Sequence, residues 1–322
     1  MRIAAGLAAA VALALASAPV AAASIVGPGA AKAETPLVAP ARRRIVVTST
    51  DGVRLVVYEW GDPNGPPILF IHGSYQSALS WMKQVSDPRL TSKYRLIAFD
   101  LRGHGASDKP DGVEYYRSSE RWAGDVVAVL DGLNLTKPVV VAWSYGARVL
   151  NDYLQAQGDG RLGGIVYVDA RSTSQGPADA AAAERAEISK RAASEDPETF
   201  IAGTRDFVRL CVERPLPRAE IDLLTEASLQ TPLYVRQAMA GRALAYEPVL
   251  KAIRAPVLIV QGAADRVVSP ATGEFTHAMI PGSRLSLYPG VGHSPFLEDP
   301  ARFDAELDAF AGRVAAAGPA AR

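Results

Sequence analysis

Two hydrophobic patterns alternate along most of this chain of 322 residues. The first is a short, continuous apolar run, which is typical of a strand buried on both faces of a sheet. Such runs occupy 68–71, 96–99, 139–142, 165–168 and 257–260. The second is a helical pattern, which separates several of these runs and is clearest at 118–132, 145–156 and 270–279. Strands that alternate with helices predict an α/β fold, in which a mostly parallel sheet is flanked by helices on both faces.

Three further strands complete the predicted sheet. Residues 45–48 and 53–58 alternate in polarity around an Asp-Gly dipeptide at 51–52, which is a favoured β-hairpin turn. A weaker strand pattern covers 285–288. The sequence therefore predicts an eight-stranded sheet. The segment 34–41, which contains two alanines and two prolines, is expected to be mobile.

The strand pattern stops between Asp169 and Arg254. This part of the chain contains four stretches of helical character, interrupted by prolines. They lie at 178–193, 197–212, 217–229 and 231–243. We therefore predict a core of residues 34–170 and 250–322, which is interrupted after the sixth strand by a helical insertion of residues 171–249.

The first 33 residues have a different character. A basic residue follows the initiator methionine, an alanine-rich apolar run continues to about Ala23, and small residues precede Glu34. This order is typical of a secretory signal peptide, so residues 1–33 are predicted to be removed on export. Cleavage after Ala23 and an uncleaved membrane anchor are the alternatives. We expect a periplasmic or secreted protein with no stable membrane association after cleavage.

Composition narrows the choice of partners and cofactors. Lys+Arg and Asp+Glu both number 34, so the formal charge is zero and no nucleic-acid partner is expected. The single cysteine, Cys211, cannot form an intramolecular disulfide and is predicted to be a small buried hydrophobe. The sequence has neither a zinc-type ligand spacing nor a phosphate-binding glycine loop. No cofactor and no metal are therefore predicted.

Candidate chemistry begins at Ser144. This serine follows the apolar run 139–142 and precedes a helical pattern, with Ala142 and Gly146 two residues to either side. Small residues at these positions let a strand and a helix cross closely, and the arrangement is typical of a nucleophile elbow. Because a serine hydroxyl is a poor nucleophile until a base removes its proton, the chain should also carry a base and a group that orients it.

Candidates for the base and for the group that orients it follow two other predicted strands. The run at 257–260 leads to Asp265 through a glycine-containing turn, and His293 follows the last strand in a Gly-Val-Gly-His-Ser-Pro segment. We expect His293 to act as the base and later as the acid, while Asp265 holds the imidazole in the required tautomer. Asp169 is the main rival for the acid, and Asp100 is expected to order a loop.

The order of nucleophile, acid and base along the chain, the His-Gly turn at 72–73 and the segment 100–110 together resemble the α/β-hydrolase family. The likeness is to the branch that includes simple esterases and cofactor-free haloperoxidases, and it covers roughly residues 45–312. It implies that the helical insertion is a cap over the nucleophile. It also implies that the backbone N–H groups of Ser74 and Tyr145 form the oxyanion hole.

The resemblance also assigns the remaining histidines. His72 and His104 match turn positions of the family and are not expected to be the base. His277, on a predicted helix, is expected to be a surface or packing residue. Several aromatic and methionine side chains are candidates to line an apolar pocket, although such residues more often belong simply to the core, and no substrate is assigned from them. They are Tyr75, Trp81, Met82, Phe207, Tyr234 and Met239.

The resemblance implies a serine hydrolase that cleaves an ester, lactone or thioester of a small, apolar acyl substrate through an acyl-serine. The same triad would serve a cofactor-free haloperoxidase or perhydrolase, or a carbon–carbon bond hydrolase. Epoxide hydrolases and haloalkane dehalogenases need an aspartate at the elbow, so Ser144 argues against both. A non-catalytic binding protein on the same fold is disfavoured by the complete set of reactive groups.

Overall fold

A computed structural model describes residues 38–170, 172, 181–240, 242 and 245–317 of the chain. The predicted signal peptide, residues 1–33, lies outside the described residues. Within the described residues, no helix combines the length and the apolar character needed to cross a membrane.

The centre of the structure is one sheet of eight strands in the order β1-β2-β4-β3-β5-β6-β7-β8. The strands are β1 (Arg43–Thr48), β2 (Arg54–Gly61), β3 (Pro67–Ile71), β4 (Arg95–Phe99), β5 (Val139–Trp143), β6 (Gly164–Val168), β7 (Val257–Gly262) and β8 (Arg284–Tyr288). Strand β2 pairs antiparallel with β1 and β4, and the remaining neighbours are parallel. The predicted fold class, a mostly parallel eight-stranded α/β sheet, is confirmed.

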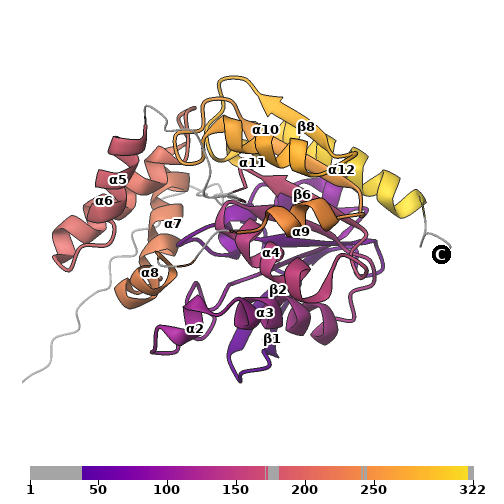
Figure 1. Ribbon diagram of the computed structural model, residues 1–322, viewed down its shortest axis with the longest axis horizontal. Helices are drawn as coiled ribbons and strands as arrows, with labels where there is room; N and C mark the ends of the chain where they lie inside the picture. The colour runs from indigo at the N-terminus through magenta and orange to yellow at the C-terminus, as the bar shows by residue number, and fades with distance from the viewer. Residues whose placement is uncertain (1–37, 171, 173–180, 241, 243–244, 318–322) are drawn as a thin grey trace, which may run out of the picture. The chain divides into compact units, whose positions relative to one another are not determined.

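Helices cover both faces of the sheet (Figure 1). One face carries α3 (Ser119–Gly132), α4 (Tyr145–Gln157), α9 (Glu247–Ala252) and α10 (Pro270–Met279). The other carries α1 (Pro88–Thr91), α11 (Pro295–Glu298) and α12 (Pro300–Ala316). Shorter elements between them are η1 (Ala78–Trp81), η2 (Gln84–Ser86) and α2 (Glu114–Arg117).

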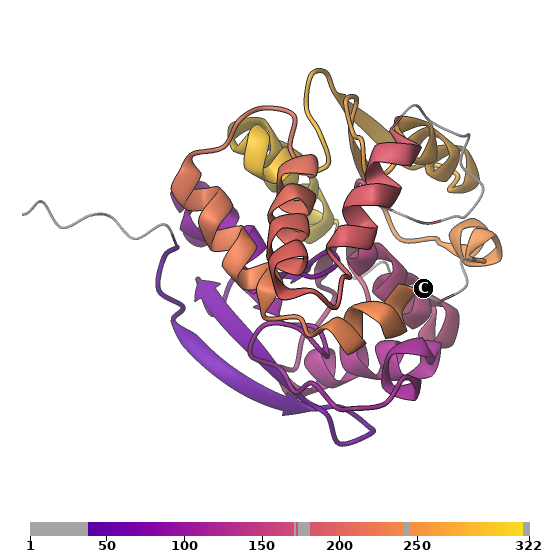
Figure 2. The same ribbon diagram turned by 90° about the vertical axis from the view of Figure 1, so that its left-hand side faces the viewer.

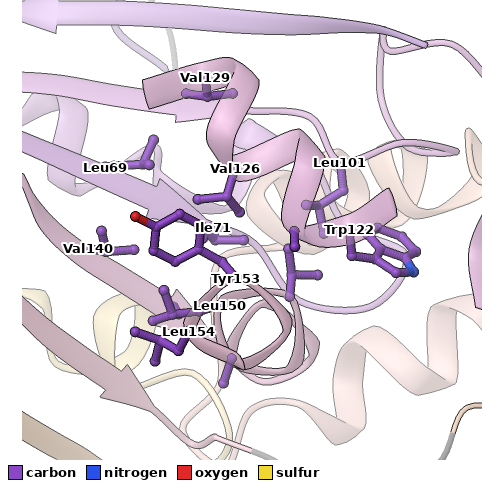
Figure 3. Packing of buried hydrophobic residues seen from close by; sticks show 14 of the residues in the cluster. Leu69, Ile71, Leu101, Trp122, Val126, Val129, Val140, Leu150, Tyr153 and Leu154 are labelled. Atoms are coloured by element: carbon purple, nitrogen blue, oxygen red, sulfur yellow. The ribbon is translucent and has the colours of Figure 1, made fainter. Parts of the chain in front are cut away.

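Strand β5 shows why its apolar run is continuous. Val140 and Ala142 point to the cluster beneath α3 and α4, whereas Val139, Val141 and Trp143 point to the cluster on the other face. All five are buried, because each face of the strand is covered. Figure 3 shows the first cluster, where side chains of the strands meet those of α3 and α4. Strand β5 is therefore held from both sides at the point where Ser144 follows it.

Five described helices lie between β6 and β7, and the first four of them are grouped together in Figures 1 and 2. These four are α5 (Ala182–Arg191), α6 (Pro197–Leu210), α7 (Arg218–Leu229) and α8 (Leu233–Ala240). Their place after the sixth strand matches the predicted insertion, and we call α5 to α8 the cap. The predicted boundary at 249/250 falls inside α9, so the described chain offers no break at that point.

One buried guanidinium joins the elements of the cap. Arg236 of α8 donates hydrogen bonds to the carbonyls of Ala192, Ser228 and Thr231 and to the hydroxyl of Thr204, at 2.6 to 3.1 Å. Its guanidinium also lies over the ring of Tyr75 in the core and that of Phe200 in α6. Burial lowers the pKa of Arg236 to about 10, so the side chain remains charged at neutral pH.

The segment before β1 differs from expectation. Residues 34–41 were expected to be mobile, but Val38, Ala39 and Ala41 pack against the apolar cluster that contains Trp60. The indole of Trp60 donates a hydrogen bond of 3.0 Å to the carbonyl of Ala39. The prediction was wrong for this part of the segment, because composition alone does not reveal an apolar surface that the segment can cover.

Candidate active site

Ser144 lies at the tight turn between β5 and α4. Its backbone has φ of 53° and ψ of −113°, a region that non-glycine residues occupy only under strain from their surroundings. Its N–H donates to the carbonyl of Val168 in the neighbouring strand β6 at 2.9 Å. A Cβ at Gly146 would approach the carbonyl oxygen of Ile71 to 2.5 Å, which explains the small residue two positions later. The geometry is that of a nucleophile elbow.

His293 is fixed by the residue that precedes Ser144. The indole Nε1 of Trp143 donates a hydrogen bond of 2.7 Å to the carbonyl oxygen of His293. The two rings also contact each other, with centroids 5.5 Å apart. His293 is 1% exposed and lines the same cavity as Ser144. The strand that carries the serine therefore also holds the loop of the predicted base.

Asp265 supplies the hydrogen bond that sets the histidine tautomer. Its Oδ2 lies 2.7 Å from Nδ1 of His293, so the proton that the ring shares is placed on Nδ1 and Nε2 is left to accept another. The other carboxylate oxygen accepts from the backbone N–H groups of Val267 and Val268, at 2.7 and 3.0 Å. This arrangement matches the predicted role of Asp265.

Asp169, the rival candidate for the acid of the triad, lies beside this pair but has different hydrogen-bond partners. Its Oδ1 accepts from the N–H of Gly262 and from Nε2 of Gln261, both at 2.8 Å. Burial and the neighbouring Asp265 raise the pKa of Asp169 well above its ordinary value. The described hydrogen bond of the His293 ring goes to Asp265, whereas the described side-chain hydrogen bonds of Asp169 come from strand β7.

The loop that carries His293 is ordered by Glu298 of α11. The carboxylate of Glu298 accepts from the N–H groups of Gly292 and Ser294 on the loop, and from those of Glu213 and Arg214 in the loop between α6 and α7 of the cap. One carboxylate therefore ties the base loop to the cap.

Two backbone N–H groups were predicted to bind an oxyanion, those of Ser74 and Tyr145. Tyr145 is the first residue of α4, and the first N–H groups of a helix have no partner within it. Ser74 follows β3 by three residues, and both Ser74 and Ser144 line the two cavities described below. A Cβ at Gly73 would meet the ring of Trp143 at 2.9 Å, so the turn before Ser74 packs directly against the elbow strand.

The remaining histidines lie away from this chemistry. His72 accepts at Nε2 from the N–H of Leu101 and bonds through Nδ1 to the carbonyl of Gly73. His104 bonds to the carbonyl of Arg102, and both rings are buried. Burial lowers the pKa of His72 to about 4. These contacts belong to turns, as expected, and His277 is exposed on α10.

Two further sequence predictions concern single side chains. Asp100 accepts from the N–H groups of Ala78 and Ala106, both at 2.8 Å, and so orders two loops. Cys211 is buried, which raises the pKa of its thiol, and its side chain lines the cavity beside His293. Both match the predicted structural roles.

Two cavities meet at Ser144. The first is lined by His293 and by apolar side chains that include Phe207, Val208 and Leu224 of the cap. Its volume is about 20 Å³, room for about one water molecule. The second has a volume of about 470 Å³ and is the wider space. Its lining includes Ser74, Tyr75, Tyr145, Phe207 and Met239, and three arginines, Arg148, Arg185 and Arg242.

Comparison with known proteins agrees with this geometry. The model of the alpha/beta hydrolase family matches residues 68–306. The chain belongs to the α/β hydrolase family. A non-heme haloperoxidase from Rhodococcus erythropolis is 28% identical over 274 residues, which are 77% of this chain and 92% of that protein.

Two solved structures are more similar in sequence to this α/β hydrolase. A candidate aryl esterase from Burkholderia cenocepacia is 36% identical, with a TM-score of 0.80 over 85% of this chain and 100% of that one. The esterase RhEst1 from Rhodococcus sp. ECU1013 is also 36% identical, with a TM-score of 0.77 over 84% of this chain and 99% of that one. The protein is therefore a hydrolase enzyme.

Sequence reasoning missed several residues that position the candidate triad of this hydrolase. Trp143 holds the loop of His293, Glu298 ties that loop to Glu213, and Gln261 donates to the rival acid Asp169, each through a hydrogen bond between residues far apart in the sequence. The sequence gives no local signal for such contacts, except that Trp143 stands next to the predicted nucleophile. The arginines of the wider cavity were also missed.

Proposed function

We propose that this α/β hydrolase is an exported serine hydrolase that cleaves a carboxylic ester-type bond through an acyl-serine. Ester, lactone and thioester substrates share the reacting carbonyl. The observation that carries the proposal is the hydrogen bond of 2.7 Å between Asp265 and His293, on a histidine that lines one cavity with the strained Ser144. The esterases among its relatives support the same class of reaction.

The proposed mechanism has two halves. Nε2 of His293 removes the proton of Ser144 as Oγ attacks the carbonyl carbon, and Asp265 stabilises the resulting imidazolium. The N–H groups of Ser74 and Tyr145 donate to the oxyanion that forms. His293 then protonates the leaving oxygen, and the acyl-serine forms. In the second half, His293 activates a water molecule that attacks the acyl-serine and frees the acid.

A perhydrolase activity is the second candidate, because a relative that aligns over most of both chains is a non-heme haloperoxidase. In that case peroxide replaces water in the second half of the reaction. The chain also aligns with epoxide hydrolase A of Mycobacterium tuberculosis, with 36% identity over 113 residues. This short alignment carries less weight, because Ser144 stands where epoxide hydrolysis needs an aspartate.

Probe labelling and a substrate panel test the proposal. A fluorophosphonate probe should label Ser144, as located by mass spectrometry of peptides, and para-nitrophenyl esters should be hydrolysed. Absence of both reactions in folded protein would exclude the serine mechanism. Formation of peracid from acetate ester and hydrogen peroxide, measured against plain hydrolysis, separates the perhydrolase from the esterase.

Export is the second part of the proposal. It rests on the basic start and apolar run of residues 1–33. Mass spectrometry of the protein from fractionated cells should find a mature chain that begins near Glu34 in the exported fraction. Retention of Met1 in the membrane fraction would favour an uncleaved anchor instead.

A further inference from the structure

Four buried aromatic rings form a continuous series behind the candidate active site. In order of contact they are the rings of Phe70, Trp81, Phe296 and Trp143, each no more than 4% exposed, and we call them the aromatic frame. The centroids of neighbouring rings along this series are 4.9, 4.5 and 5.0 Å apart. These separations lie in the favoured range for aromatic pairs, so the frame is packed as a unit.

Each ring of the frame comes from a different part of the candidate site. Phe70 lies in β3, which leads into the turn of Ser74, and Trp81 lies in η1, which follows that turn. Trp143 precedes the proposed nucleophile, and Phe296 follows the proposed base by three residues. The frame therefore joins the oxyanion turn, the elbow and the base loop.

Trp143 is the ring of the frame that touches two of these parts directly. Its indole N–H donates to the carbonyl of His293, and the benzene half of the same indole lies against Gly73. A Cβ at Gly73 would have its three nearest neighbours in this ring, at 2.9, 3.1 and 3.2 Å. The φ of Gly73 is not in the left-handed region, so the backbone alone does not require glycine there. The closeness of the ring requires it.

We propose that Trp143 is a positioning residue for the oxyanion hole as well as for the base, because its ring fixes the turn of Gly73 and Ser74 at contact distance. The inference rests on the proposed ester hydrolysis and concerns the same site. Oxyanion donors act over a narrow range of about 2.7 to 3.1 Å. A shift of the turn against the rigid indole therefore changes the rate of reaction without changing what the cavities bind.

A double-mutant cycle tests the contact between the turn and the ring. Gly73→Ala should lower kcat by about 10- to 100-fold, because its methyl group meets the indole and displaces the oxyanion donor. Trp143→Phe should lower kcat by about 10-fold, because the carbonyl of His293 loses its donor. The double variant should be no slower than Gly73→Ala alone, because the smaller ring leaves room for the methyl group. Independent effects would instead multiply.

Two measurements show whether the oxyanion hole is what changes. Gly73 is not among the described residues that line the two cavities, so KM for a para-nitrophenyl ester should stay within about threefold in Gly73→Ala. A trifluoromethyl ketone forms a reversible adduct with a serine hydroxyl, and the oxygen of that adduct occupies the oxyanion hole. Its inhibition constant should rise by the factor by which kcat/KM falls. An unchanged inhibition constant would contradict the proposal.

Phe296→Leu and Phe303→Leu keep the test decisive if Gly73→Ala fails to fold. Both rings are buried in the same apolar cluster and contact each other, with centroids 6.0 Å apart. Phe296 belongs to the frame and follows the base loop, whereas Phe303 lies on α12, which carries no group of the candidate site. We expect similar losses of unfolding free energy in urea, but a fall in kcat of about 10-fold in Phe296→Leu alone. Equal falls in kcat would show that lost packing, and not lost position, lowers the rate.

The cycle also separates this inference from the proposed reaction. Ester hydrolysis by the wild type, with losses that multiply in the double variant, would leave the reaction standing and refute the shared positioning. A wild type that neither hydrolyses esters nor reacts with the fluorophosphonate probe would refute the reaction, and the inference with it.

Discussion

The sheet edge and the cap hold their functional side chains in different ways. At the sheet edge, backbone groups do most of the positioning: a strained turn presents Ser144, the carbonyl of His293 is bound by Trp143, and two N–H groups bind Asp265. In the cap, α5 has no buried residue among those described, and the helices meet around the side chain of Arg236.

This difference suggests separate roles, in which the sheet edge carries the reacting groups and the cap selects the substrate. A backbone turn needs particular residues at fixed spacing, so the reactive groups leave a local pattern in the sequence. A cavity between helices needs only side chains of suitable size and charge, which come from positions far apart in the chain. We therefore expect substitutions at the sheet edge to change the rate of reaction and substitutions in the cap to change what is bound and how stably the cap folds.

The largest effect is expected at the proposed nucleophile. Ser144→Ala should lower kcat for ester hydrolysis by about 10⁶-fold, because Oγ forms the covalent bond, while binding and the oxyanion donors leave residual catalysis. Probe labelling should disappear, and circular dichroism should be unchanged. Near wild-type turnover in this variant would show that Ser144 is not the nucleophile and that the reaction does not take place at this sheet edge.

The two buried acids give a sharper test of the sheet edge. Asp265→Asn should lower kcat by about 10⁴-fold, since an amide favours the wrong tautomer of His293. Asp169→Asn should have a far smaller effect, because its amide can still accept from Gly262 and Asp169 has no described bond to His293. The steady-state kcat of both variants decides between them. If Asp169→Asn is the crippling change, the acid has been assigned to the wrong strand.

In the cap, the centre of the hydrogen-bond network should control stability. Arg236→Met removes the described donor to the buried carbonyls of Ala192 and Thr231, so the free energy of unfolding should fall by about 3 kcal/mol. Arg191→Met is the control, because Arg191 pairs with Asp206 at the surface and should contribute less than about 1 kcal/mol. Urea unfolding measures both. Equal losses of unfolding free energy in the two variants would show that Arg236 stabilises the cap no more than a surface arginine does.

Acid should weaken the turn next to the oxyanion donors. The pKa of His72 is lowered by burial to about 4, against 6.5 in the unfolded chain, so the unfolded state binds more protons between these values. The contribution of His72 to the free energy of unfolding is fully present above pH 6.5 and is lost as the pH falls toward 4. The loss between pH 7 and pH 5 should be about 2 kcal/mol. Buried acids such as Asp169, whose pKa is raised, contribute in the opposite direction.

The difference between wild type and His72→Gln isolates this contribution. Urea unfolding at pH 7 and at pH 5 should show a smaller loss of stability in the variant, whatever its stability at pH 7. Parallel pH dependences in the two proteins would mean that His72 is not buried in its neutral form.

Much of the sheet could be predicted from the sequence, and so could the turn of Ser144 and the contact between Asp265 and His293. Continuous apolar runs locate strands such as β5, and the spacing around Ser144 follows from the close approach of Gly146 to β3. The hydrogen bonds between Trp143 and His293 and between Glu298 and Glu213 could not be predicted, because each joins residues that are adjacent only after folding. The arginine-lined cavity could not be predicted either, because its three arginines come from α4, from α5 and from the end of the cap.

The contact between Trp143 and His293 has an optical consequence. An indole ring that touches an imidazole loses part of its fluorescence when the imidazole becomes positively charged. With ring centroids 5.5 Å apart, the emission of Trp143 should therefore follow the protonation of the base directly. The difference spectrum between wild type and Trp143→Phe would report that event in the resting enzyme, without substrate and without a label. The strand that leads to the proposed nucleophile thus ends in a native fluorophore that reports on the proposed base.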